Sequence, residues 1–305
     1  MNEENENENY KSIVQDYVVK NARKRKIINS LITGVLFSFV IIAVLPLVSI
    51  LIDVFRNGAA AFNLDFLILP PGAMGSSDGG IGPAIQGTLM IVGFATVIGA
   101  PVGVLVGVYL SEYSSSSKRF AYFLRLFIDV LTGIPSVVIG IVGYITIVLT
   151  LGSFSIVAGA FVLSIIMIPI VARVSEETLK LIPNSLREAA YALGIPKWKV
   201  VWHIVVKGSK SGITTGIVLA ISRIAGETAP LIMTILGTSL FFSSFSSPVD
   251  ALPLRIWRLA SQPYSSAHEQ GWGAALLLIL LVLSLSILLR MVSQKKGYSL
   301  KSTTT

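Results

Sequence analysis

Long runs without charge constrain this chain more than any other feature of its sequence. Six stretches have about the 20 consecutive apolar residues that a helix needs to cross the hydrocarbon core of a bilayer. They cover residues 27 to 52, 82 to 110, 130 to 151, 154 to 172, 211 to 235 and 271 to 289. Only 13% of the residues are charged, against about 25% in soluble domains. The sequence therefore predicts an all-α, polytopic membrane protein with six transmembrane helices.

The chain lacks most of the residues that several kinds of chemistry require. The chain has no Cys and only two His residues, His203 and His268, which stand apart. Disulfides and thiolate metal sites are excluded, and Cys or His nucleophilic catalysis is disfavoured. The chain also lacks the G-x-x-x-x-G-K-[ST] loop that cradles ATP phosphates. We expect no enzymatic activity, metal or cofactor in this chain, and any energy from ATP must enter through another subunit.

The positions of the basic residues predict the orientation. The 24 Lys and Arg residues exceed the 16 Asp and Glu residues, for a net charge of +8. If the N-terminus is inside, only Arg56, Arg255 and Arg258 fall on the outer side, and Arg223 falls within a span. Short cytoplasmic loops carry the excess of positive charge in membrane proteins. Both termini are therefore predicted to be cytoplasmic, and the basic excess gives no support to nucleic-acid binding.

The runs divide the chain into segments. The first ten residues, a repeat of Glu and Asn, are too polar to bury a core and are expected to be disordered. The expected order is a disordered cytoplasmic tail at 1–26, a first transmembrane helix at 27–52, an extracytoplasmic loop at 53–81, a five-helix core at 82–293 and a cytoplasmic C-terminal tail at 294–305. Within the core, 174–210 is the longest cytoplasmic loop and 236–270 is an extracytoplasmic loop.

The cytoplasmic loop 174–210 has the signals of two ordered helices. Ser185 and Glu188 fit a capping box at the start of the first helix, and Gly194 is suited to its end. The apolar stripe of this helix consists of Leu186, Ala189, Ala190 and Leu193. Pro196 suits the start of the second helix, whose apolar face consists of Trp198, Val201, Trp202 and Val205. We interpret this loop as a docking element.

The fifth run contains a charged pair. Arg223 lies about 12 residues into the run, roughly 18 Å at 1.5 Å per residue, too deep to reach either surface easily. Glu227 is four residues further on, on the same helical face. Pro230 cannot donate a hydrogen bond to the carbonyl of Gly226, so the helix is predicted to bend or open beside Glu227.

Two interpretations of this pair remain open. An intramembrane charge costs at least about 2.5 to 3.5 kcal/mol by insertion scales, so it is rarely kept without a use. The fork of an Arg side chain matches a tetrahedral oxyanion well. One hypothesis is that Arg223 meets a permeating anion, while Glu227 holds Arg223 between transport events or accepts a proton-bearing ligand oxygen. The other is a purely structural ion pair within the helix.

Weaker signals concern packing. Gly99, Gly103 and Gly107 repeat at four-residue spacing, which predicts the close approach of another helix. The segment 252–257 is predicted to be a short amphipathic piece near the outer surface. Arg255 and Arg258 are interpreted as solvated charges.

The cytoplasmic loop resembles a known family. Glu188-Ala189-Ala190, Gly194 and Ile204 match the EAA loop of bacterial ABC importer permeases, EAA-x3-G-x9-I-x-L-P. Val206 and Lys207 depart from the Leu and Pro of that pattern. The resemblance implies a MetI-like permease fold. It also implies that two short helices of the loop fit a cleft on a cytoplasmic ATPase, with Glu188, Ala189, Ala190 and Gly194 as the coupling residues.

A second resemblance is narrower. The segment 226–230, preceded by Arg223, is similar to the PstA permeases of phosphate ABC importers, as are segments 82–88 and 133–136. The resemblance implies a bacterial or archaeal inner-membrane complex with the sister permease PstC, two copies of the ATPase PstB, which binds ATP and Mg²⁺, and the phosphate-binding protein PstS. The translocation residues would be Arg223, Glu227 and Thr228.

Three alternatives stay open. The first is a permease for another oxyanion, such as sulfate or molybdate, which spacing alone does not separate from phosphate. The second is an ATP-independent secondary transporter or channel that uses Arg223 and Glu227 as a relay. The third is a membrane anchor or sensing scaffold without transport. A docking loop favours the ATP-driven class, because a free-standing carrier does not need one.

Overall fold

The computed structural model describes residues 3–76, 78–115 and 117–294. Most of them are helical, and within these ranges the extended pairing is limited to two isolated bridges, Pro71 with Gly79 and Leu236 with Val249. This confirms the all-α prediction. The chain forms two compact units, one up to Arg56 and one from Asn57 onward. The predicted C-terminal tail, 294–305, lies outside the described residues except for Gln294.

The first unit is made by one long helix, α1 (Glu3–Gly58). Its apolar side chains between residues 27 and 52 are exposed, as suits a helix surrounded by lipid. The disordered tail expected at 1–26 is not found at residues 3–26, which are helical. The costly step in helix formation is the first turn, and each later residue adds a hydrogen bond to an existing helix. The apolar run therefore supplies a nucleus from which the polar segment extends, and acidic residues near an N-terminus favour the helix dipole.

The second unit is a helical bundle. Its longer helices are α3 (Gly82–Val108), α4 (Lys118–Gly133), α7 (Ile156–Lys180), α10 (Lys210–Ile224) and α13 (Ser265–Gln294). Its shorter helices are η1 (Ala59–Ala61), α2 (Leu64–Ile68), α5 (Ser136–Gly143), α6 (Leu149–Leu151), α8 (Asn184–Ala192), α9 (Lys197–Val200), α11 (Ala229–Thr234) and α12 (Leu252–Ala260). Three π-helical segments continue α3, α5 and α9: η2 (Tyr109–Tyr113), η3 (Tyr144–Val148) and η4 (Val201–Val206).

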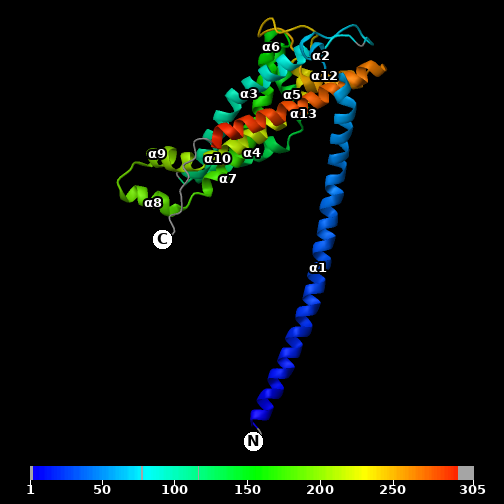
Figure 1. Cartoon of the computed structure of the whole chain (residues 1–305). Coiled ribbons are helices and arrows are strands. Elements are labelled where there is room, and N and C mark those ends of the chain that lie inside the picture. The colour runs from blue at the N-terminus through cyan, green and yellow to red at the C-terminus, as the bar shows by residue number, and fades with distance from the viewer. Residues whose placement is uncertain (1–2, 77, 116, 295–305) are drawn as a thin grey trace. The chain divides into compact units, whose positions relative to one another are not determined.

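The bundle has two distinct ends. Figure 1 shows α8 and α9 at one end and α2, α6 and α12 at the other, with α3, α7, α10 and α13 running between them. The largest apolar core lies where α3, α7, α10 and α11 meet, around Ile91, Leu163, Met167 and Ile224. The predicted cytoplasmic docking loop and the predicted extracytoplasmic loop therefore lie at opposite ends of the unit.

In the part of the chain that the structure describes, four helices are long and apolar enough to cross a membrane alone: Lys24–Ala61, Gly82–Tyr113, Ile156–Lys180 and Ser265–Met291. Two bent pairs raise the number to as many as six, which equals the predicted count. Lys118–Gly133 meets Ser136–Leu151 at 101°, and Lys197–Val206 meets Lys210–Ile224 at 69°. The predicted third span is therefore interrupted at 134–135, whereas the second bend, at 207–209, lies just before the predicted fifth span. The candidate site is built by the break at 134–135 and by a further break between α10 and α11.

The predicted close approach at the glycine repeat is present between α3 and α7. A Cβ atom added at Gly99 would lie 3.1 Å from the Cβ of Met167, and one at Gly103 would lie 2.7 Å from the Cβ of Val171. The repeat continues at Gly107, which faces Ser175 at 2.6 Å. Both helices contribute residues at intervals of four, so one ridge of each fits the groove of the other.

We expect the substitution Gly103→Ala to destabilise the protein by about 1 to 3 kcal/mol, the usual cost of overpacking. The added methyl group overlaps Val171, a buried residue that cannot move without disturbing the core. Gly93→Ala is the control on the same helix, because nothing lies within 4 Å of its added Cβ. That control should be neutral or slightly stabilising, since Ala favours a helix over Gly. Equal thermal midpoints for the two variants in detergent would contradict the expectation.

Candidate functional site

The first wall of the site is the break between α4 and α5. Pro135 disfavours helical backbone at the residue before it and lacks an N–H group, so α4 ends at Gly133 and α5 begins at Ser136. The predicted span 130–151 therefore does not begin at residue 130, which belongs to α4. That helix starts at Lys118, in a segment that the sequence assigned to a loop. Charged residues interrupt its apolar run, and two of them, Arg125 and Asp129, pair with residues of α7.

The second wall is the break between α10 and α11. Helix α10 ends at Ile224 and α11 starts at Ala229, with Pro230 in its first turn. The predicted opening beside Glu227 is thus confirmed, and the predicted span 211–235 consists of two helices. The Cα atom of Pro230 lies only 2.7 Å from a Cβ added at Gly140, so α11 packs directly against α5.

The two breaks border one cavity of about 730 Å³. Its polar and charged lining residues are Thr132, Ser136, Arg223 and Glu227. Its apolar lining includes Leu131, Ile134, Ile139, Ile166, Pro169, Ile170 and Leu219. The sequence predicted that Arg223 and Glu227 lie together. It did not predict that residues beside the α4–α5 break line the same cavity, together with residues of α7.

Arg223 and Glu227 form the predicted ion pair. The Nη2 atom of Arg223 lies 3.6 Å from the Oε1 atom of Glu227, a longer separation than a good charge-assisted hydrogen bond. The Arg223 side chain is 61% exposed, whereas that of Glu227 is 13% exposed. The guanidinium group therefore keeps donors that face the cavity, and a fork of this kind binds a planar or tetrahedral oxyanion through two parallel hydrogen bonds.

Thr228 has a different position. It is not among the residues that line the cavity. Its carbonyl oxygen accepts hydrogen bonds from the N–H groups of Leu231 and Ile232, both at 3.1 Å, at the start of α11. The structure thus brings two of the three predicted translocation residues to the cavity, and the third begins the helix beside it.

The docking loop presents the predicted motif on α8. Glu188 and Ala189 are exposed, whereas Ala190 is buried against the bundle. Gly194 has a φ of +74°, the left-handed conformation that ends a helix and that glycine adopts without strain. Leu186 and Leu193 are 51% and 81% exposed. Large apolar side chains exposed at the end of a bundle are typical of a surface that binds another protein.

Two details of the docking loop differ from the prediction. Ser185 does not cap α8, because the helix begins one residue earlier, with Pro183 at the N-cap position and no side-chain cap. The predicted apolar face of the second helix is divided. Val201 and Val205 are fully buried in a core cluster, whereas Trp198 and Trp202 are 54% and 41% exposed. Of the four residues of the predicted apolar face, the two Trp residues are the exposed ones.

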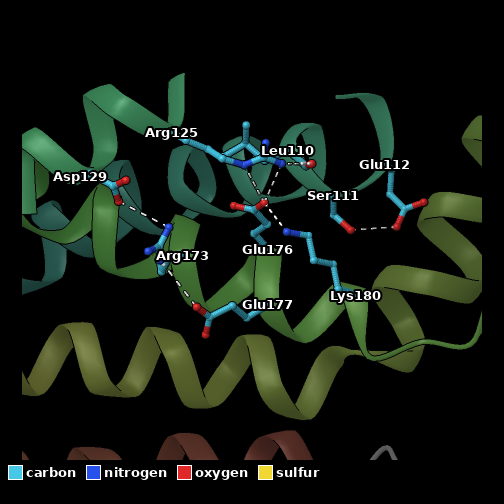
Figure 2. A network of polar contacts seen from close by, with 9 residues as sticks. All are labelled: Leu110, Ser111, Glu112, Arg125, Asp129, Arg173, Glu176, Glu177 and Lys180. Atoms are coloured by element: carbon cyan, nitrogen blue, oxygen red, sulfur yellow. Dashed lines mark hydrogen bonds and ion pairs between the residues drawn. The ribbon is translucent and has the colours of Figure 1, made fainter. Parts of the chain in front are cut away.

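Sequence reasoning missed a polar network at the same end of the bundle. Figure 2 shows Glu176 of α7 between Arg125 of α4 and Lys180. The Oε1 atom of Glu176 accepts hydrogen bonds from Arg125 Nε at 3.0 Å and Lys180 Nζ at 2.6 Å. Arg125 also donates to the carbonyl of Leu110 at 3.2 Å. Arg125 and Glu176 are 51 residues apart, so no local sequence pattern predicts their contact.

A second buried pair lies near the opposite end. Asp250 and Arg255 form an ion pair whose side chains are 0% and 9% exposed, so Arg255 is not the solvated charge that the sequence suggested. Arg255 also donates to the carbonyl of Thr238 at 3.0 Å, which ties α12 to the loop before it. Burial raises the pKa of the Asp250 carboxyl above its ordinary value, and the charge and hydrogen bond of Arg255 oppose that shift.

Comparison with known proteins identifies the class. Residues 99–298 match the family model described as "Binding-protein-dependent transport system inner membrane component". The chain belongs to this family of transporter permeases. Solved structures agree on the fold. The chain superposes on a bacterial ABC transporter involved in the import of the acidic polysaccharide alginate with a TM-score of 0.63 and 16% identity, over 88% of this chain and 96% of that one. The MetNI methionine ABC transporter in an inward-facing conformation gives a TM-score of 0.56 and 18% identity, over 71% and 94%.

Curated relatives narrow the family to one group. The chain is 40% identical to the phosphate transport system permease protein PstA of Haemophilus influenzae, over 89% of this chain and 96% of the relative. It is 43% identical to PstA of Yersinia pestis, over 75% and 76%. It is 33% identical to the probable PstA of Methanocaldococcus jannaschii, over 89% and 96%. These similarities place the chain in the PstA group.

Proposed function

We propose that this chain is the membrane-spanning permease subunit of an ATP-driven importer of inorganic phosphate and forms half of the translocation pathway. The observation that carries the proposal is the exposed guanidinium of Arg223 in a cavity bordered by two helix breaks. The names of the relatives support phosphate over sulfate or molybdate as the ion. A tetrahedral phosphate offers several oxygens to the fork of Arg223.

Glu227 has a separate role in this proposal. Between transport events its carboxylate holds the Arg223 guanidinium, which would otherwise be an unpaired charge within the membrane. When the anion arrives, its oxygens replace the carboxylate as acceptors. A monohydrogen or dihydrogen phosphate also carries a hydroxyl, which can donate to Glu227. The long separation of 3.6 Å between Arg223 and Glu227 supports an exchangeable contact.

The driving force enters through the docking helix. In the proposal, the exposed face of α8, with Glu188, Ala189 and the turn at Gly194, fits a cleft on the ATPase PstB. Two copies of PstB bind and hydrolyse ATP with Mg²⁺, the sister permease PstC completes the pathway, and PstS delivers phosphate from outside. The complex lies in the bacterial or archaeal inner membrane, with both termini of this chain in the cytoplasm.

Uptake measurements test this proposal. Inside-out and right-side-out vesicles that contain the chain with its three partner proteins are supplied with radiolabelled phosphate, with and without ATP on the side of α8. We expect uptake that requires ATP and PstS, with excess sulfate or molybdate leaving its rate unchanged. Competition by sulfate would favour the permease for another oxyanion. Uptake without ATP would favour a secondary transporter or channel, and folded complexes without uptake would favour a scaffold.

A further inference from the structure

Arg187 holds α8 against the rest of the bundle. Its Nη2 atom donates to Glu112 Oε1 at 2.7 Å, and its Nε atom donates to Glu112 Oε2 at 3.3 Å. Its guanidinium also donates to the carbonyl oxygens of Leu179, at 3.0 Å, and Ile182. One side chain of the docking helix thus contacts the π-helical end of α3 and the last turn of α7.

The pair is shielded from water, unlike most ion pairs at a protein surface. The side chains of Arg187 and Glu112 are 12% and 6% exposed. Two parallel hydrogen bonds to one carboxylate fix both the distance and the orientation of the guanidinium. Exposed ion pairs contribute little and tolerate movement. A bidentate pair removed from water keeps its geometry, because either partner left alone would be a buried, unpaired charge.

Neighbouring residues of α8 have different roles: one attaches the helix to the bundle, and the next is available to a partner protein. Successive residues of a helix point about 100° apart, so Arg187 and Glu188 face different directions. Arg187 shares the inner face with Ala190, three residues later, which is buried. Glu188 lies on the exposed face. The outer face is free to meet a partner while the inner face is fixed to the bundle.

The second helix of the docking loop is joined to the same π-helical segment. The Nζ atom of Lys197 lies 4.6 Å from the ring centroid of Tyr113, a cation–π contact. Glu112 and Tyr113 are neighbours in η2, so both α8 and α9 are attached to the end of α3. The next residue on the other side, Ser111, donates a hydrogen bond to Glu112 at 3.0 Å, as Figure 2 shows.

We propose that the Arg187–Glu112 ion pair is the joint through which movement of the docking helix α8 is passed to α3 and α7. Arg187 is in this sense a positioning residue, since it acts through Glu112 and two backbone carbonyls. The inference rests on the proposed function, because it takes α8 to be the helix that meets the ATPase. Without the joint, α8 keeps its packing against α9 and η4 but loses its polar tie to α3 and α7, and closure of the ATPase pair displaces the loop instead of the bundle.

The test compares transport with ATP hydrolysis in the purified four-protein complex, using Arg187→Gln and Glu112→Gln. We expect each variant to retain PstB and to hydrolyse ATP, while the number of phosphate ions moved per ATP falls roughly 5- to 150-fold, the usual range of energetic coupling between sites. A defect confined to folding would lower the amount of complex but leave this ratio unchanged. The double variant should be no worse than either single variant, because both remove the same contact.

Arg173→Gln is the matched control. Arg173 also lies near this end of the bundle and pairs with two acids, Asp129 and Glu177, but at 3.4 and 3.6 Å and with 52% of its side chain exposed. Its removal should leave the ratio of phosphate to ATP as in the wild type. Hydrogen exchange of the amides of residues 184–194 gives a second readout that needs no substrate. Exchange there should be faster in Arg187→Gln and unchanged in Arg173→Gln.

Two outcomes would overturn the inference. One is a wild-type transport ratio and wild-type exchange in Arg187→Gln. The other is loss of PstB from both single variants during purification, because the pair would then serve assembly and not transmission. Failure of the proposed substrate is a separate result. If the wild-type complex carries another oxyanion, the same ratio is measured with that ion.

Discussion

Replacing Arg223 with Gln should lower phosphate uptake by about 100- to 1,000-fold while the complex still assembles. Loss of two charge-assisted hydrogen bonds to the anion corresponds to about 3 to 4 kcal/mol, at 1.4 kcal/mol per factor of ten. The side chain is 61% exposed, so removing its charge costs the fold little. The measurement is the initial rate of radiolabelled phosphate uptake, normalised to the amount of assembled complex.

Two further variants sharpen this expectation. Arg223→Lys keeps the charge but loses the planar fork, so its uptake should lie between that of the wild type and that of the Gln variant. Arg173→Gln removes an Arg of similar exposure that does not line the cavity, and its uptake should be unchanged. If Arg223→Gln transported at the wild-type rate, the ion pair with Glu227 would be purely structural.

Reversing the charge of Glu188 should separate the permease from its ATPase. Glu188 lies on the exposed face of α8, on which Leu186 and Leu193 are also exposed, so a Lys at this position points away from the bundle, toward the proposed ATPase. An unmatched charge in a protein interface typically costs several kcal/mol. We expect Glu188→Lys to reduce co-purification of PstB at least tenfold, and ATP-dependent uptake by a similar factor.

The control for this variant is Glu177→Lys. Glu177 is 68% exposed and belongs to α7, where its partner Arg173 is itself exposed. The same change of charge at this site should leave PstB bound. Equal binding of PstB by Glu188→Lys and by the wild type would instead assign docking to another surface of this end of the bundle. The Trp residues exposed on the second helix of the loop would then be examined.

Those elements of the fold that depend on local physics were predicted from the sequence. The long apolar runs gave α3, α7 and α13, and the stretch 27–52 gave the central part of α1. The opening beside Glu227 followed from one missing N–H group at Pro230, and the end of α8 followed from Gly194. Each of these features depends on a few neighbouring residues, so their positions in the sequence were sufficient.

The features that were missed depend on partners far apart in the chain. Helix α4 extends back to Lys118 because Arg125 finds Glu176 on α7, and an apolar-run criterion excludes such a charged segment. Arg187 and Glu112 are 75 residues apart. Ser185 was assigned as a cap from a motif, but the N-cap of α8 is Pro183, two residues earlier, and the helix begins at Asn184. The cavity itself is bordered by two breaks, of which the sequence predicted only the one beside Glu227.

The close meshing of α3 and α7 restricts how the bundle changes shape. Sliding one helix past the other would move Val171 and Ser175 away from Gly103 and Gly107, the positions whose missing side chains make room for them. These two helices therefore form a fixed column. The chain is able to bend at the breaks 134–135 and 225–228, and Ile134, Gly226 and Glu227 of these breaks line the cavity. If the cavity opens first to one side of the membrane and then to the other, α5 and α11 would rotate relative to the fixed pair of helices α3 and α7.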